Sequence, residues 1–155
     1  MDAESLVMLF EYNYRALRAN ISGLSHEDSL IQPAPGGNCL NWVLGHIVAT
    51  RNETLRLLGE GPVWNEEEAA PYRRGANPIT DDVGALPLEK IVADLDRSQE
   101  LITAGLRAIS KEGLAASAGE STVSESLAGL QFHEAYHAGQ TGLLRRLAGK
   151  EGAIK

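Results

Sequence analysis

The chain has 155 residues, of which 43% are hydrophobic, and its 14 lysines and arginines are outnumbered by 21 aspartates and glutamates, for a formal net charge of −7. This length and apolar content predict one domain, residues 1–155, with an ordinary hydrophobic core. The acidic balance, with no basic cluster, argues against nucleic acid as a partner. The start of the chain is acidic and no apolar run reaches the ~20 residues of a membrane span, so we expect a cytoplasmic protein with no membrane partner.

The first two amphipathic stretches are residues 5–24 and residues 39–58, each with apolar side chains at helical spacing. Asn13 and Asn20 lie on the apolar stripe of the first, and a structural hydrogen bond is favoured for each over a place near a polar site. The second follows a segment rich in proline and glycine, with Asn38 as its expected N-cap. Gly45 costs this helix about 1 kcal/mol relative to alanine, which indicates close approach of a neighbouring helix or a ligand.

Residues 59–86 break the helical pattern with repeated prolines and glycines, so they predict a long crossover. A loop of this length is expected to wrap the bundle or to cover a site. Trp64 and Tyr72 are its expected anchors, and both are candidates for part of a substrate wall. The acidic run at residues 66–68 is typical of a solvated surface.

A third helix is expected from Pro87 to about residue 110, followed by a connection rich in small residues. Ser121 or Thr122, together with Glu125, resembles a capping box that opens a fourth helix over residues 122–147, about 39 Å long. The four stretches predict an all-α four-helix bundle with a long crossover between the second and third helices.

Three histidines are the main functional clue. His133 and His137 stand four residues apart on one side of the fourth helix and look inward on a helical wheel, which is the spacing of a chelating pair. His46 borders the apolar stripe of the second helix. Three imidazoles with an open position are typical of a reactive divalent metal site, and this donor set does not choose among zinc, nickel, copper and iron.

Three other side chains are candidates for a part in such a site. Cys39 has no adjoining basic residue in sequence, so an inert buried thiol is favoured over a nucleophile. Glu53 follows His46 by seven residues and is a weak candidate for a fourth ligand or a catalytic base, against a surface ion pair as the simpler role. Residues 133–137, which include Glu134, also fit the H-E-x-x-H motif of zinc metalloproteases. That class needs a preceding sheet and a downstream ligand, and the sequence has no strand pattern before the motif and no histidine after it.

Over almost its full length the chain resembles the DinB/YfiT-like family of four-helix-bundle metalloenzymes. The resemblance rests on the sequences Asn-Trp-Val-Leu-Gly-His-Ile at 41–47, His-Glu-Ala-Tyr-His-Ala-Gly-Gln at 133–140 and Gly-Leu-Leu-Arg-Arg at 142–146. It implies that His46, His133 and His137 bind a divalent metal, most often zinc or nickel, with iron as a further option. It also implies frequent homodimers. The family includes thiol-dependent S-transferases and isomerases, so the resemblance implies a small-molecule substrate and a low-molecular-weight thiol (bacillithiol, mycothiol or glutathione) as cosubstrate.

Two classes of function remain open at this point. The first is a metalloenzyme, an S-transferase acting on small electrophiles, with a metal-dependent hydrolase as its close rival. The second is a non-catalytic metal-binding stress-response protein. An open coordination position would favour the enzyme, because a structural site is closed by a fourth protein ligand. The small residues at 115–118, expected to be exposed, favour a homodimer.

Overall fold

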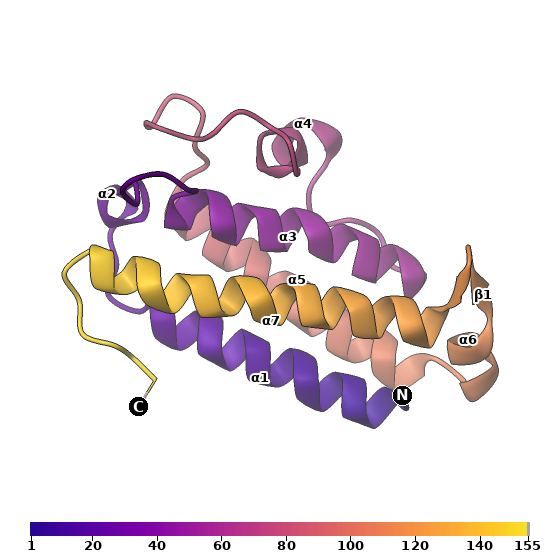
Figure 1. The fold of residues 1–155 in the computed structure, drawn as a ribbon. Coiled ribbons are helices and arrows are strands. Elements are labelled where there is room, and N and C mark those ends of the chain that lie inside the picture. The colour runs from indigo at the N-terminus through magenta and orange to yellow at the C-terminus, as the bar shows by residue number, and fades with distance from the viewer. Residues whose placement is uncertain (155) are drawn as a thin grey trace.

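The computed structural model describes residues 1–154, and four long helices make up its body (Figure 1). They are α1 (Ala3–Ile21), α3 (Leu40–Leu57), α5 (Leu88–Ala108) and α7 (Val123–Leu147). Short elements join them: α2 (His26–Ser29), α4 (Glu66–Ala69), the 3-10 helix η1 (Ala70–Tyr72), α6 (Lys111–Ala115), and an antiparallel pair of two-residue strands, β1 (Ser117–Ala118) and β2 (Ser121–Thr122). The predicted all-α four-helix bundle is confirmed.

The order of packing explains why the chain needs a long crossover. α1 and α3 each pack mainly against α5 and α7, so the four helices form a square in cross-section. α3 and α5 run in the same direction, as two hydrogen bonds show. Asn41 donates to the carbonyl of Leu86, and further along both helices Arg51 donates to the carbonyl of Leu95, so the residue numbers of the partners rise together. Two parallel neighbours need a connection that returns along the bundle, and α4 and η1 lie within that connection (Figure 1).

The crossover is fastened by the two aromatic residues predicted to anchor it. Trp64 and Tyr72 are 1% and 0% exposed, and their ring centroids lie 5.3 Å apart. The Trp64 indole donates a hydrogen bond to Asp94 at 2.7 Å. The Tyr72 hydroxyl donates to Asn41 at 3.0 Å and accepts from the backbone N–H of Leu86 at 2.7 Å. Because both side chains are fully buried in these contacts, the expectation that they line a substrate wall is wrong.

Gly45 is where the crossover comes closest to α3. A Cβ atom at this position would overlap the ring of Tyr72, so the close approach predicted from the sequence is real, and the neighbour is a side chain of the crossover. The ring cannot swing aside without breaking the two hydrogen bonds of its hydroxyl group.

We therefore expect Gly45→Ala to lower the free energy of unfolding by about 1–3 kcal/mol, although alanine is the better helix former. Urea denaturation measures the change. Gly129→Ala in α7 is the matched control, because a Cβ there meets nothing within 4 Å and the substitution should stabilise the helix. Equal stability of the two variants would contradict the overlap with Tyr72.

Local details of the helix ends differ in part from expectation. The capping box of α7 is confirmed, with Thr122 accepting from the backbone of Glu125 and the Glu125 side chain accepting from that of Thr122. Asn38 is not the N-cap of α3: that position is Cys39, which makes no capping bond through its side chain. The connection before α7 holds α6 and the two short strands, which its small residues did not indicate. Within residues 1–154, none of the helices combines the length and apolar character that crossing a membrane requires.

Candidate metal centre

The structure brings the three predicted histidines together. His46 comes from α3, and His133 and His137 come from successive turns of the antiparallel neighbour α7. The Nε2 atom of His133 lies 3.2 Å from that of His46 and 3.1 Å from that of His137. Within the described residues these three side chains form the one group of histidine, cysteine or carboxylate side chains close enough to share an ion, with ligand atoms within 4.8 Å of one another. Metal binding by them remains a prediction.

Two of the three imidazoles are oriented through Nδ1. His46 Nδ1 lies 2.7 Å from the backbone carbonyl oxygen of Tyr72, and since a carbonyl only accepts, Nδ1 carries the proton. His137 Nδ1 lies 2.7 Å from the side-chain oxygen of Gln140, which assigns the same tautomer. Both rings therefore present an Nε2 lone pair to the centre of the group, as ligating histidines do when a second partner holds the ring.

These lone pairs do not satisfy one another. The Nε2 atom of His133 lies against the Nε2 atoms of both His46 and His137. An N–H group at His133 Nε2 could donate to only one of these two nitrogens, so the lone pair of the other would point at a nitrogen without a hydrogen bond. The Nδ1 atom of His133 is buried without a hydrogen-bond partner. A cation would be shared by all three lone pairs. Tetrahedral zinc, with bonds of 2.0–2.1 Å, places its nitrogens about 3.3 Å apart. The two separations that His133 makes are close to this value, and all three ligand atoms lie within 4.8 Å of one another, so the residues fit a divalent metal.

Aromatic rings flank the group. Trp42 stacks on His46 with ring centroids 4.7 Å apart and an interplanar angle of 9°, and Tyr136 meets His137 edge-on at 5.1 Å. The sequence reasoning did not single out either residue. A signal was available for Trp42, because it precedes His46 by four residues and thus shares its side of α3.

Burial keeps the three imidazoles neutral. Removal from water lowers the pKa of His46, and it lowers the pKa of His133 with a smaller contribution from the charge of His46. Burial is also the main reason that the pKa of His137 falls to about 4. The Nε2 lone pairs are therefore available at neutral pH without displacement of protons, which favours metal binding.

This burial predicts the acid sensitivity of the metal-free protein. The pKa of His137 is lower in the folded chain than its ordinary value of 6.5, so the unfolded chain binds more protons between pH 6.5 and about 4. The free energy of unfolding is therefore unaffected by this residue above pH 6.5. It decreases as the pH drops from 6.5 to about 4, by up to about 3 kcal/mol. Urea denaturation from pH 7 to 4 measures the slope. His137→Gln should flatten it, and identical slopes in the two proteins would contradict the prediction.

Cys39 and Glu53 do not join the histidines. The Cys39 thiol is buried and donates a weak hydrogen bond to the carbonyl of Ile79 at 3.5 Å, consistent with an inert thiol. The side chain of Glu53 is 49% exposed and forms an ion pair with Arg56 on the surface of α3. Glu53 therefore has the surface ion-pairing role, and it is not part of the histidine group.

Glu134 has a different place from the glutamate of a protease motif. Its side chain is 4% exposed, and both carboxylate oxygens accept from the guanidinium group of Arg51, each at 2.8 Å. Within residues 1–154 the only strands are β1 and β2, of two residues each, so the sheet of that enzyme class is also missing from the described chain. Sequence reasoning missed the pairing of Glu134 with Arg51.

The fold and this site define a helical bundle with a candidate three-histidine metal centre between two antiparallel helices. The family model described as the DinB superfamily matches residues 9–141, and the chain belongs to that superfamily. The match confirms the resemblance noted in the sequence.

One solved structure supports the same fold. It is a crystal structure described as the conserved protein of a locus from Enterococcus faecalis, with a TM-score of 0.76 and 17% sequence identity over 97% of this chain and 99% of that chain. At this identity the likeness speaks for the fold alone. No curated protein matches the chain.

Proposed function

We propose that this protein is a metal-dependent enzyme that transfers a low-molecular-weight thiol to a small electrophile. The observation that carries the proposal is the convergence of three Nε2 atoms with no fourth histidine, cysteine or carboxylate in the group among residues 1–154. Three protein ligands are typical of catalytic sites, whereas structural sites use four.

His46, His133 and His137 would hold the metal, with zinc or nickel first and iron as a further option. When bound there, a divalent cation lowers the pKa of a thiol or water and stabilises negative charge on the reacting groups. The carbonyl of Tyr72 and the amide of Gln140 keep the Nε2 lone pairs of His46 and His137 directed at the centre. Cys39 is buried outside this group, so the nucleophile is assigned to the cosubstrate.

A cavity that reaches the histidine group through Gln140, and that none of the three histidines lines, supports a small substrate. It measures about 320 Å³ and is lined by Gln140, which also contacts His137, and by apolar residues that include Val43 and Leu144. This volume is at the lower end of the range for ligand pockets. In the proposed transfer, the thiol sulfur bonds to the electrophilic carbon, the leaving group departs with its electron pair, and the thiol proton passes to solvent.

Hydrolysis of a small substrate is the second candidate. The cavity that Gln140 lines has no charged residue in its wall, whereas a thiol such as glutathione carries carboxylates that a cationic side chain would recognise. Water needs no such partner, and the same three histidines would serve it. A non-catalytic metal-binding role in stress response is the third outcome that the experiment must separate.

The test is a panel of assays with protein loaded with zinc, nickel or iron and a chromogenic electrophile. The electrophile is offered with glutathione, bacillithiol, mycothiol or no thiol. Turnover that requires a thiol and is lost in His46→Ala supports transfer. Turnover without any thiol assigns the protein as a hydrolase, and no turnover with any metal assigns it to the binding class.

We also propose that the protein forms a homodimer. Ala115 and Ala116 are exposed at the end of α6, in keeping with a surface that a second copy could cover, and closed pairs are the commonest oligomers. Light scattering at micromolar concentration should give twice the 16.6 kDa mass of one chain. The monomer mass under these conditions would overturn the proposal.

A further inference from the structure

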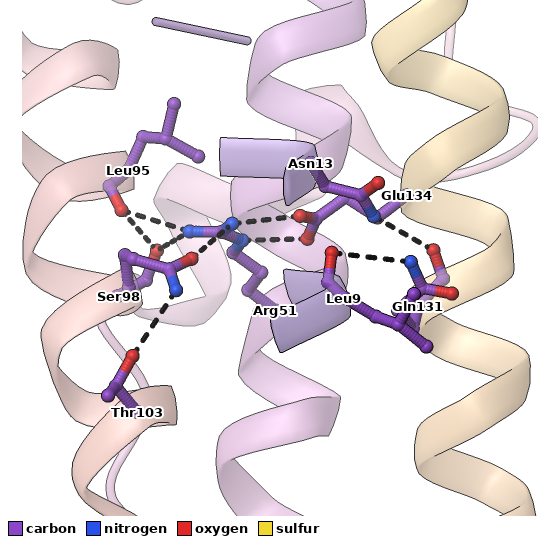
Figure 2. Close-up of polar contacts among 9 residues, drawn as sticks. Leu9, Asn13, Arg51, Leu95, Ser98, Thr103, Gln131 and Glu134 are labelled. Carbon is purple, nitrogen blue, oxygen red and sulfur yellow. Dashed lines mark hydrogen bonds and ion pairs between the residues drawn. The ribbon is translucent and has the colours of Figure 1, made fainter. Parts of the chain in front are cut away.

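We propose that a buried polar layer across the middle of the bundle sets the position of α7 along α3 and so holds His133 and His137 opposite His46. The layer consists of Asn13 on α1, Arg51 on α3, Ser98 and Gln99 on α5, and Glu134 on α7. Figure 2 labels all of these residues except Gln99. The inference rests on the proposed metal site, and it assigns positioning roles to residues that do not ligate the metal.

Arg51 is the centre of the layer, and all of its N–H groups are used. Its side chain is 1% exposed. Nε and Nη2 donate to the two oxygens of Glu134, each at 2.8 Å, and Nη2 also donates to Gln99 at 2.9 Å. Nη1 donates to the hydroxyl of Ser98 at 2.9 Å and to the carbonyl of Leu95 at 3.0 Å. Five donors thus meet five acceptors on two neighbouring helices, as Figure 2 shows for those it labels, so α3 is tied to both α5 and α7 at one level.

This layer divides the apolar core into two clusters. On α1, Phe10 belongs to one cluster and Leu17 to the other, with Asn13 between them. The same alternation occurs on every long helix: Val48 and Leu55 enclose Arg51, Leu95 and Ile102 enclose Ser98 and Gln99, and Leu127 and Ala138 enclose Glu134. The layer is therefore at one height across all four helices.

α7 depends on the layer because its middle offers little apolar surface to lock it in place. Between Leu127 and Leu144 the buried positions are Glu134, His137, Ala138 and Thr141, and none of them is a large apolar side chain. Apolar contact alone is non-directional and would let this stretch slide along its neighbours. Hydrogen bonds from Asn13 to Gln131 and from Asn20 to Thr141 set its position against α1. The doubly bonded pair of Arg51 and Glu134 sets its position against α3.

A buried ion pair can fix the position of a helix without adding to the stability of the fold. Replacing such a pair by apolar residues of similar size is often neutral or stabilising, because two charges no longer have to leave water, while the pair itself can specify one register. Glu134 directly follows His133 in the chain, so a shift of α7 at this level moves the histidine as well. We therefore expect joint replacement of Arg51, Gln99 and Glu134 by apolar residues to spare the fold and weaken the metal site.

The main test is the variant Arg51→Met/Gln99→Met/Glu134→Leu, which removes the ion pair and its amide partner. Asn13 and Ser98 keep their hydrogen bonds to the backbone carbonyls of Gln131 and Leu95. The stability of the variant in urea should be near that of the wild type, while its affinity for Co²⁺, measured by titration and visible absorption, should fall about tenfold or more, the usual effect of groups that orient metal ligands. The absorption bands of bound Co²⁺ should also shift. Ile102→Val, a control within an apolar cluster, should lose some stability and keep wild-type affinity and spectrum.

The outcomes are separable. Wild-type affinity and an unchanged Co²⁺ spectrum in the folded triple variant would overturn the positioning role while leaving the proposed function intact. A wild-type protein that binds no Co²⁺ would overturn both. If the triple variant does not fold, Ser98→Ala takes its place, because it removes a single acceptor of Arg51. A weaker affinity and a shifted spectrum in Ser98→Ala then support the layer, and wild-type values overturn it.

Discussion

We expect the variant His133→Ala/His137→Ala to keep the helical fold and to lose its bound metal. One imidazole, that of His46, would remain of the three whose Nε2 atoms converge between α3 and α7. A single imidazole in place of three removes most of the binding free energy of a divalent cation at such a site. Circular dichroism should retain its helical signal, because the hydrogen-bonded caps and the two apolar clusters are untouched.

The measurement is elemental analysis of purified protein, with wild type and variant loaded and dialysed side by side. His26→Ala is the matched control, since His26 is the remaining histidine of the four in the chain. It lies outside the group, where it contacts Asp82 and accepts from the backbone of Leu88. The control should hold as much metal as the wild type. Equal metal content in the double variant and the wild type would remove the metal assignment.

We expect Arg51→Met to be among the most destabilising single substitutions in the chain, with a loss of about 3–5 kcal/mol in the free energy of unfolding. Removing the guanidinium group leaves the carboxylate of Glu134 buried without its partner, and it leaves acceptors on Ser98 and Gln99 unpaired. An unpaired buried charge costs far more than the pair itself contributes, because the carboxylate has lost its water without compensation.

Arg56→Met on the same helix is the control for this prediction. Arg56 pairs with Glu53, and the two side chains are 67% and 49% exposed, so water replaces the lost interaction. Its effect should stay within about 0.5 kcal/mol. Urea denaturation of both variants gives the comparison. Similar losses of unfolding free energy in Arg51→Met and Arg56→Met would contradict the prediction that burial makes the loss of the Arg51 pair more costly.

Much of the fold and of the candidate site was open to prediction from local sequence. Helix spacing of apolar residues, the prolines and glycines of residues 59–86, and the capping box of Thr122 with Glu125 are short-range signals, so the four helices and the crossover were predicted nearly to their ends. His133 and His137 were also readable as a pair, because residues four apart on a helix share one side whatever surrounds them. The place of His46 opposite them came from the resemblance to a family as much as from its own spacing.

Only the tertiary structure decided which distant groups meet. The carbonyl of Tyr72 orients His46 across 26 positions of the chain, and Arg51 and Glu134 pair across 83, distances over which no periodic pattern carries information. Glu134 illustrates the difference. In the sequence it is the glutamate of a protease-like motif beside a histidine, but it faces Arg51 because the packing of α7 between α1 and α3 turns this position toward the polar layer. The sequence by itself determined helices, caps and a chelating pair, since these depend on neighbours along the chain. Packing determined the tautomers, the burial and the polar layer, because they depend on side chains that the fold alone brings together.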